Sequence, residues 1–147
     1  TLDVIGSGPA LAGLIGLSAR VGAADRVRFR GALPGDVVLE AYREADVLVL
    51  VSDSEGWPKV IVEAMAFGVV PIGNDRGLVP EIVSGGRGFT VAPRDVEGLT
   101  QLILHLERKP EERVAVANKA QQWAARYSLE EFAATFAQML AEQWNQD

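Results

Sequence analysis

The sequence contains no cysteine and only one histidine among its 147 residues. Without a thiol, this chain cannot supply a disulfide framework, a thiolate zinc site or a cysteine nucleophile. A single histidine without a neighbouring cluster of ligands makes a poor metal site, so we expect no metal and no cofactor. His105 falls beside the apolar stripe of its predicted helix, which predicts a surface position.

Positive charge is also in short supply. The chain has 14 Lys and Arg against 20 Asp and Glu, a formal net charge of -6. A broad nucleic-acid surface needs a basic face that displaces counterions from phosphates, so we expect no nucleic-acid partner. A small anionic ligand remains compatible, because a helix N-terminus can hold a phosphate against the global charge. The longest apolar runs, 47–51 and 69–72, are far shorter than the roughly 20 residues of a membrane-spanning helix.

The remaining composition is that of a soluble globular protein, with 48% hydrophobic and 23% charged residues. The length predicts a single domain over residues 1–147. Short apolar runs alternate with helical patterns, which predicts an α/β fold with a Rossmann-like parallel sheet of about five strands flanked by helices. The predicted strands are 2–6, 27–30, 46–52, 69–73 and 88–91. The predicted helices are 9–21, 35–44, 58–67, 95–107, 111–126 and 129–144.

The most informative segment is 52–68, with the sequence SDSEGWPKVIVEAMAFG. It follows a buried-looking strand and leads into a helix whose first position we expect to be Pro58, because the fixed torsion of proline suits a first helical turn. Gly68 lies where a left-handed residue would end that helix. The ligand crevice of an open α/β sheet lies at the carboxyl ends of its strands, so this turn is where the fold presents chemistry.

Two glutamates flank the start of this helix. Glu55 would stand in the loop above the N-terminus, and Glu63 would lie roughly 7–8 Å further along the axis. Free amides near Lys59 and Val60, backed by the helix dipole, could hold a phosphate between them. Carboxylates accept hydrogen bonds from sugar diols, so the spacing fits a nucleoside diphosphate sugar. The alternative is that Glu55 caps the helix and Glu63 is a solvated surface residue.

Short motifs follow one another in a definite order along the chain. They are VIGSGP (4–9), VRFRG (27–31), ADVLVL (45–50), SxSEGWP (52–58), EAMAxG (63–68), GLVPEIV (77–83) and GFTV (88–91). Each motif alone is weak, but their order and separation are specific. With them the chain resembles, over nearly all its length, the retaining glycosyltransferases of family 4, and specifically the C-terminal, donor-binding domain of their GT-B fold.

The resemblance implies a role for particular residues. Glu55, the catalytic candidate, would bind hydroxyls of the transferred sugar and would not act as a general acid, and Glu63 would bind the ribose. The diphosphate would lie on the backbone of Gly56, Trp57, Pro58, Lys59 and Val60. The loop containing Arg30, Gly31 and Leu33 would lie against the base. Gly6 and Gly8 would form a tight turn lining the cleft, and Gly77 and Leu78 would be peripheral donor contacts.

Some of these residues have ordinary alternatives. Trp57 either lines the donor cleft or fills space between the loop and the sheet. For Lys59, pairing with Glu63 four residues on is slightly favoured over a phosphate contact. Gly77 and Leu78 could simply belong to a loop and a short helix.

The resemblance also implies partners. The donor would be a UDP- or GDP-linked sugar, transferred with retention and without a divalent metal. The N-terminal acceptor domain, and the first strand and helix of this domain, would lie outside the chain, which alone should be inactive. The full-length enzyme would be a cytoplasmic hexosyltransferase, with the inner face of the membrane as an alternative location.

The first strand of the family's sheet would separate strands 2–6 and 46–52. Without it, we expect these two strands either to pair directly or to borrow a strand from a neighbouring molecule in a homodimer.

Two other classes of function remain open at this point. One is a Rossmann-like nucleotide-binding module without transfer activity. The other is half of a 2-epimerase-type nucleotide-sugar enzyme, which would need catalytic acids and a histidine that the sequence does not reveal.

Overall fold

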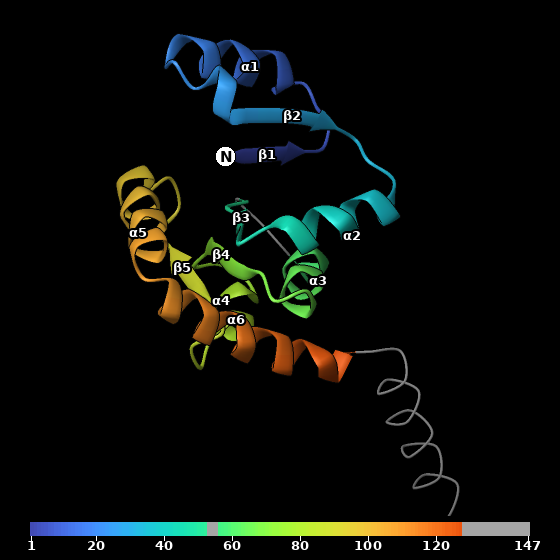
Figure 1. Cartoon of the computed structure of the whole chain (residues 1–147), viewed down its shortest axis with the longest axis vertical. Helices are drawn as coiled ribbons and strands as arrows, with labels where there is room; N and C mark the ends of the chain where they lie inside the picture. Colours follow the sequence, from blue (N-terminus) through green and yellow to red (C-terminus); the bar gives the residue numbers. More distant parts are fainter. Residues whose placement is uncertain (53–55, 128–147) are drawn as a thin grey trace, which may run out of the picture. The chain divides into compact units, whose positions relative to one another are not determined.

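The computed structural model describes residues 1–52 and 56–127 (Figure 1). The chain divides into two compact units, Thr1–Glu44 and Ala45–Asp147. No helix within the described ranges is long and apolar enough to cross a membrane.

The first unit is a βαβ arrangement followed by a helix. Its elements in order are β1 (Leu2–Ile5), α1 (Leu11–Arg20), a 3-10 turn η1 (Ala24–Arg26), β2 (Val27–Gly31) and α2 (Gly35–Glu44). The strands pair in parallel from Leu2 opposite Val27, and the register shifts between Val4 and Ile5. A crossover helix between two parallel strands is the connection that this pairing requires.

The second unit contains a three-stranded parallel sheet in the order β3-β4-β5. Its elements are β3 (Val47–Leu50), α3 (Lys59–Ala66), β4 (Val70–Asn74), α4 (Val79–Val83), β5 (Phe89–Val91), α5 (Val96–Arg108), α6 (Pro110–Ala124) and a 3-10 turn η2 (Ala125–Tyr127). All five residues of the central strand β4 are buried. A strand covered on both faces reads as a continuous apolar run, which is why its sequence lacks alternation.

Two clusters of buried side chains form the core of the second unit. One joins helices and consists of Ile61, Met65, Val79, Ile82, Val83, Ala120 and Ala124. The other joins strands to α5 and α6 and consists of Val70, Ile72, Val91, Leu106 and Val116. Among the described residues of the first unit, only Tyr42 is buried.

The predicted α/β fold class is confirmed, and the predicted strands and helices up to residue 126 match the observed ones within about two residues at each end. Pro110 begins α6, and Gly68 ends α3 with a φ of +74°. The expected helix 129–144 lies outside the described residues.

The arrangement of the strands differs from the prediction in one respect. The five strands form two sheets, β1-β2 and β3-β4-β5, instead of one. Within the first unit β1 pairs with β2, and within the second β3 pairs with β4, while a direct pairing of β1 with β3 stays a prediction. Within each sheet a helix connects the strands that pair: α1 connects β1 to β2, α3 connects β3 to β4, and α4 connects β4 to β5.

Candidate functional site

The turn between β3 and α3 is built around Pro58, which is buried. Pro58 has φ −78° and ψ 79° and caps the helix, which begins one residue later at Lys59. The prediction that proline would be the first helical residue is therefore off by one position, because its ψ lies outside the helical range. Gly56 and Trp57 are exposed on this turn, and Glu55 lies outside the described residues.

The backbone amides at the start of α3 are only partly free. The Lys59 N–H donates to the carbonyl of Trp57 at 2.9 Å, and the Ile61 N–H donates to the carbonyl of Pro58 at 3.0 Å. The expectation of a free amide at Lys59 is wrong, because the bend at Pro58 brings the Trp57 carbonyl onto it. Among the described residues, the Val60 N–H has no backbone acceptor. This amide lies at the positive end of the helix dipole.

Glu63 lies on the exposed side of α3. The buried residues Ile61, Ala64 and Met65 face the core from the same helix. A carboxylate on the solvent side can reach a ligand lying along the helix. Its position relative to Glu55 stays a prediction.

Trp57 takes part in an aromatic contact that ties the turn to the end of α6. Its ring centroid lies 5.5 Å from that of Tyr127, which in turn lies 4.6 Å from the ring of Trp123. Tilted pairs at such distances are favourable aromatic geometries. Trp57 therefore packs against Tyr127, and 45% of it remains exposed on the turn.

Asn74 is a buried polar residue at this sheet edge that the sequence reasoning missed. It ends β4 and is 3% exposed, and its Nδ2 donates a hydrogen bond to the carbonyl of Ser52. This bond fixes the carboxyl end of β3, where the 52–68 segment begins. The sequence feature that could have identified Asn74 is a polar residue directly after the apolar run of a central strand. Its Oδ1 has no hydrogen-bond partner in the described part of the chain.

Gly77 and Leu78 follow the carboxyl end of β4, as predicted. Both are exposed, and Gly77 has a φ of +59°, a left-handed conformation that favours glycine. Leu78 immediately precedes α4 and is 41% exposed. Parallel strands end at the same sheet edge, so these residues belong to the edge where Ser52 and Asn74 lie.

The predicted site residues of the first unit form a separate group. The Gly6 N–H donates to the Gly31 carbonyl at 2.7 Å, which joins the two strand ends. A cavity of about 260 Å³ is lined there by Val4, Ile5, Gly6, Ser7, Gly8, Pro9, Ala10, Leu11 and Leu14. Nη1 of Arg30 lies 3.3 Å from Asp3, which turns the guanidinium toward β1, while Leu33 is half-buried. A contact of this loop with a base stays a prediction.

The described residues contain no group of three or more potential metal ligands. His105 is exposed on α5, as predicted, and its Nε2 lies 2.8 Å from Oε2 of Glu112.

Comparison with known families gives a match over residues 1–123 to the family described as "Glycosyl transferases group 1". The chain belongs to this family. It is 32% identical over 111 residues to an N-acetyl-alpha-D-glucosaminyl L-malate synthase of Bacillus anthracis. The matched segment makes up 75% of this chain and 29% of that protein. It is also 32% identical over 116 residues to a D-inositol 3-phosphate glycosyltransferase of Corynebacterium urealyticum, covering 78% of this chain and 27% of the relative.

Solved structures share the fold of this chain. An Anabaena protein, Alr3699/HepE, crystallised with UDP-glucose, superposes with a TM-score of 0.80 at 25% identity, covering 99% of this chain and 40% of that one. The C-terminal domain of a glycosyl transferase group 1 family protein from Francisella tularensis superposes with a TM-score of 0.73 at 22% identity, covering 81% and 63% of the two chains. The predicted resemblance to the C-terminal domain of a GT-B glycosyltransferase is confirmed.

Proposed function

We propose that the chain binds the donor of a retaining, family 4 glycosyltransferase, which transfers a sugar from a nucleoside diphosphate sugar to an acceptor. One observation carries the proposal: the segment SEGWPK…E leads from the carboxyl end of β3 into α3, within a chain that belongs to the glycosyl transferases group 1. The 25% identical Anabaena structure in complex with UDP-glucose supports a nucleotide-sugar ligand. We retain UDP and GDP as candidate carriers.

In this proposal, different residues at and before the start of α3 bind different parts of the donor. The Val60 amide and the Lys59 ammonium hold the diphosphate at the positive end of the helix. The exposed Glu63 carboxylate accepts hydrogen bonds from the ribose diol. Glu55 accepts hydrogen bonds from hydroxyls of the transferred sugar. Fixed positive charge stabilises the departing diphosphate, so the reaction needs no divalent metal.

The remaining predicted residues have supporting roles in the proposal. Gly77 and Leu78 approach the donor from the segment after β4. Gly6, Gly8, Arg30, Gly31 and Leu33 of the first unit shape the wall against the base. The turn before α3 is formed by Gly56, Trp57 and Pro58. The contact of Trp57 with Tyr127 helps to hold this turn in place.

The proposal also concerns a longer protein that contains this chain. The chain spans 29% and 27% of the two relatives described above and 40% of the Anabaena structure. We propose that an N-terminal acceptor domain completes a cytoplasmic hexosyltransferase that can work at the inner face of the membrane. Residues 1–147 then act as one donor-binding domain, inactive alone and able to share strands in a homodimer.

A thermodynamic cycle tests whether Glu63 binds the ribose. It combines a change in the protein, Glu63→Gln, with a change in the ligand, removal of the ribose diol. Calorimetric titration of the chain with UDP and GDP identifies the carrier, and the titration is repeated with Glu63→Gln. We expect Glu63→Gln to weaken binding of the preferred nucleotide about tenfold, because charge-assisted hydrogen bonds to the diol are weakened. With the 2′,3′-dideoxy analogue, wild type and variant should bind equally, since the cycle isolates the carboxylate–diol pair.

The matched control is Glu107→Gln, which removes the same charge from an exposed position on α5. It should bind the nucleotide like the wild type. Equal loss in both variants would mean that overall charge, and not the ribose contact, controls binding. Binding of a nucleotide without any transfer by the full-length protein would favour the nucleotide-binding module.

A further inference from the structure

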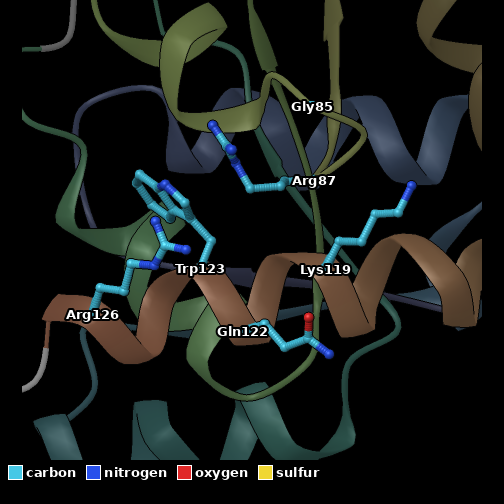
Figure 2. Close-up of a pocket in the computed structure, with 6 residues that line it drawn as sticks. All are labelled: Gly85, Arg87, Lys119, Gln122, Trp123 and Arg126. Carbon is cyan, nitrogen blue, oxygen red and sulfur yellow. The ribbon is translucent and has the colours of Figure 1, made fainter.

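A second cavity lies between the loop before β5 and α6. It has a volume of about 220 Å³ and is lined by Gly85, Arg87, Lys119, Gln122, Trp123 and Arg126. Figure 2 shows Arg87 extending from the loop while Lys119 and Trp123 extend from the helix. Three of the six residues are basic and none is acidic. The cavity is smaller than the roughly 300–1,000 Å³ of typical small-molecule sites, so it suits a small group.

Arg87 is held rigidly at the wall of this cavity. Its Nε donates to the Ile82 carbonyl at 2.8 Å, and Nη2 donates to the Glu81 carbonyl at 2.8 Å and to the Ser84 hydroxyl at 3.0 Å. Its Cζ lies 4.8 Å from the ring centroid of Trp123, within cation–π range. These contacts cap the end of α4 but use only one side of the guanidinium. In the described parts of the chain Nη1 has no acceptor, so its donors remain available to a ligand.

Two glycines bring the loop close to these cations. Gly85 and Gly86 have φ values of +66° and +77°. A Cβ at Gly85 would lie 3.3 Å from Nη1 of Arg87, and one at Gly86 would lie 3.1 Å from Nζ of Lys119. Side chains there would be strained and would crowd both cations. The two glycines therefore leave room for an arginine and a lysine that line the same cavity.

Among the described residues, no acidic side chain forms a salt bridge with the basic side chains that line this cavity. Lys119 and Arg126 are exposed, and within residues 1–52 and 56–127 neither forms a salt bridge. By contrast, Arg28 forms a salt bridge with Asp3 at 2.6 Å. Like charges around one cavity repel, and a bound anion would reverse that repulsion.

Two of the lining residues lie at the opposite end of the sheet from Gly77 and Leu78. Gly85 and Arg87 precede β5 and so lie toward the amino ends of the parallel strands. Gly77, Leu78 and the start of α3 follow strands and lie at the carboxyl ends. The inference therefore does not rest on the proposed function.

We propose that this cavity is an anion site that binds a phosphate group. Nη1 of Arg87 supplies N–H donors, and the exposed Lys119 and Arg126 supply further positive charge. The ligand is a soluble phosphate or phosphomonoester, or the headgroup of a phosphatidic acid, because both present the same dianionic group.

The test follows the indole N–H signal of Trp123 by NMR while inorganic phosphate is added at constant ionic strength. The signal is assigned with Trp123→Phe. The double variant Lys119→Gln/Arg126→Gln leaves the bonds of Arg87 to α4 intact, so it should fold, as circular dichroism will check. We expect it to bind phosphate about tenfold or more weakly, because two charged donors are lost. The charge-matched control Arg108→Gln/Lys109→Gln, both exposed positions, should bind like the wild type.

Vesicles distinguish the two sources of the phosphate. The chain is sedimented with phosphatidylcholine vesicles that contain or lack phosphatidic acid. Sedimentation that requires phosphatidic acid and is lost in the Lys119→Gln/Arg126→Gln variant assigns a lipid headgroup, whereas a phosphate response without sedimentation assigns a soluble ligand. A Trp123 signal that millimolar phosphate leaves unchanged, or that responds equally in both double variants, overturns the proposal.

Discussion

Gly73 lies near the carboxyl end of β4, where the sheet and two helices meet. A Cβ at this position would lie 2.5 Å from Cγ1 of Val79 and 3.5 Å from Cδ1 of Ile61. Both neighbours are buried, so they have little room to move. We expect Gly73→Ala to lower the free energy of unfolding by about 1–3 kcal/mol, measured by urea denaturation, because overpacking strains the core.

Gly13 provides the matched control. It lies inside α1, and a Cβ there would meet no atom within 4 Å. Gly13→Ala should raise stability by up to about 1 kcal/mol, since glycine is a poor helix former. Opposite signs for the two substitutions would show that space, and not glycine itself, decides the outcome. A neutral Gly73→Ala would contradict the close packing at β4.

At the residue scale, local pattern predicted some features and missed others. Gly68 was predictable, because a left-handed residue after a helical run is a local requirement. The contact of Trp57 with Tyr127 was not, because it joins residues 70 positions apart and depends on how α6 packs. The hydrogen bond from Asn74 to Ser52 was missed for the same reason.

At the scale of elements, α5 has the clearest N-terminal signal. Asp95 precedes the helix, and its Oδ1 accepts a hydrogen bond from the Gly98 N–H at 2.8 Å. We expect Asp95→Ala to lower the free energy of unfolding by about 0.5–2 kcal/mol, because an N-terminal amide loses its partner. Asp95→Asn keeps an acceptor and should retain most of the stability. Thermal melts followed by circular dichroism compare them, and equal losses would argue against the cap.

The helices and strands themselves were largely predictable. Runs such as 47–51 and 69–73 are apolar and short, and proline or glycine separates them from helical patterns. The start of α3 shifted by one residue because the ψ of Pro58 depends on the turn that it completes. The helix α4 has only five residues, too few for a periodic signal, and it is held by the packing of Val79, Ile82 and Val83.

At the scale of the whole molecule, edge strands determine the expected assembly. Within its own described sheet, each of β1 and β3 is a terminal strand. Unpaired strand edges can add a strand from another chain, so we expect self-association that increases with concentration in sedimentation velocity. Ile5→Lys on β1 should weaken it, because a lysine on an edge strand opposes pairing. Leu17→Lys on α1, similarly exposed, should not. A monomer at every concentration would contradict the strand-sharing proposal.

The sequence by itself determined the alternation of strands and helices, the turn before α3 and the family resemblance, because each depends on neighbouring residues and their spacing. Only the tertiary structure showed that the five strands form two sheets and that Trp57 packs on Tyr127. It also showed that Arg87, Lys119 and Arg126 line one cavity. These features join residues far apart in the chain. Their free energy comes from packing and charge in three dimensions, which no local pattern encodes.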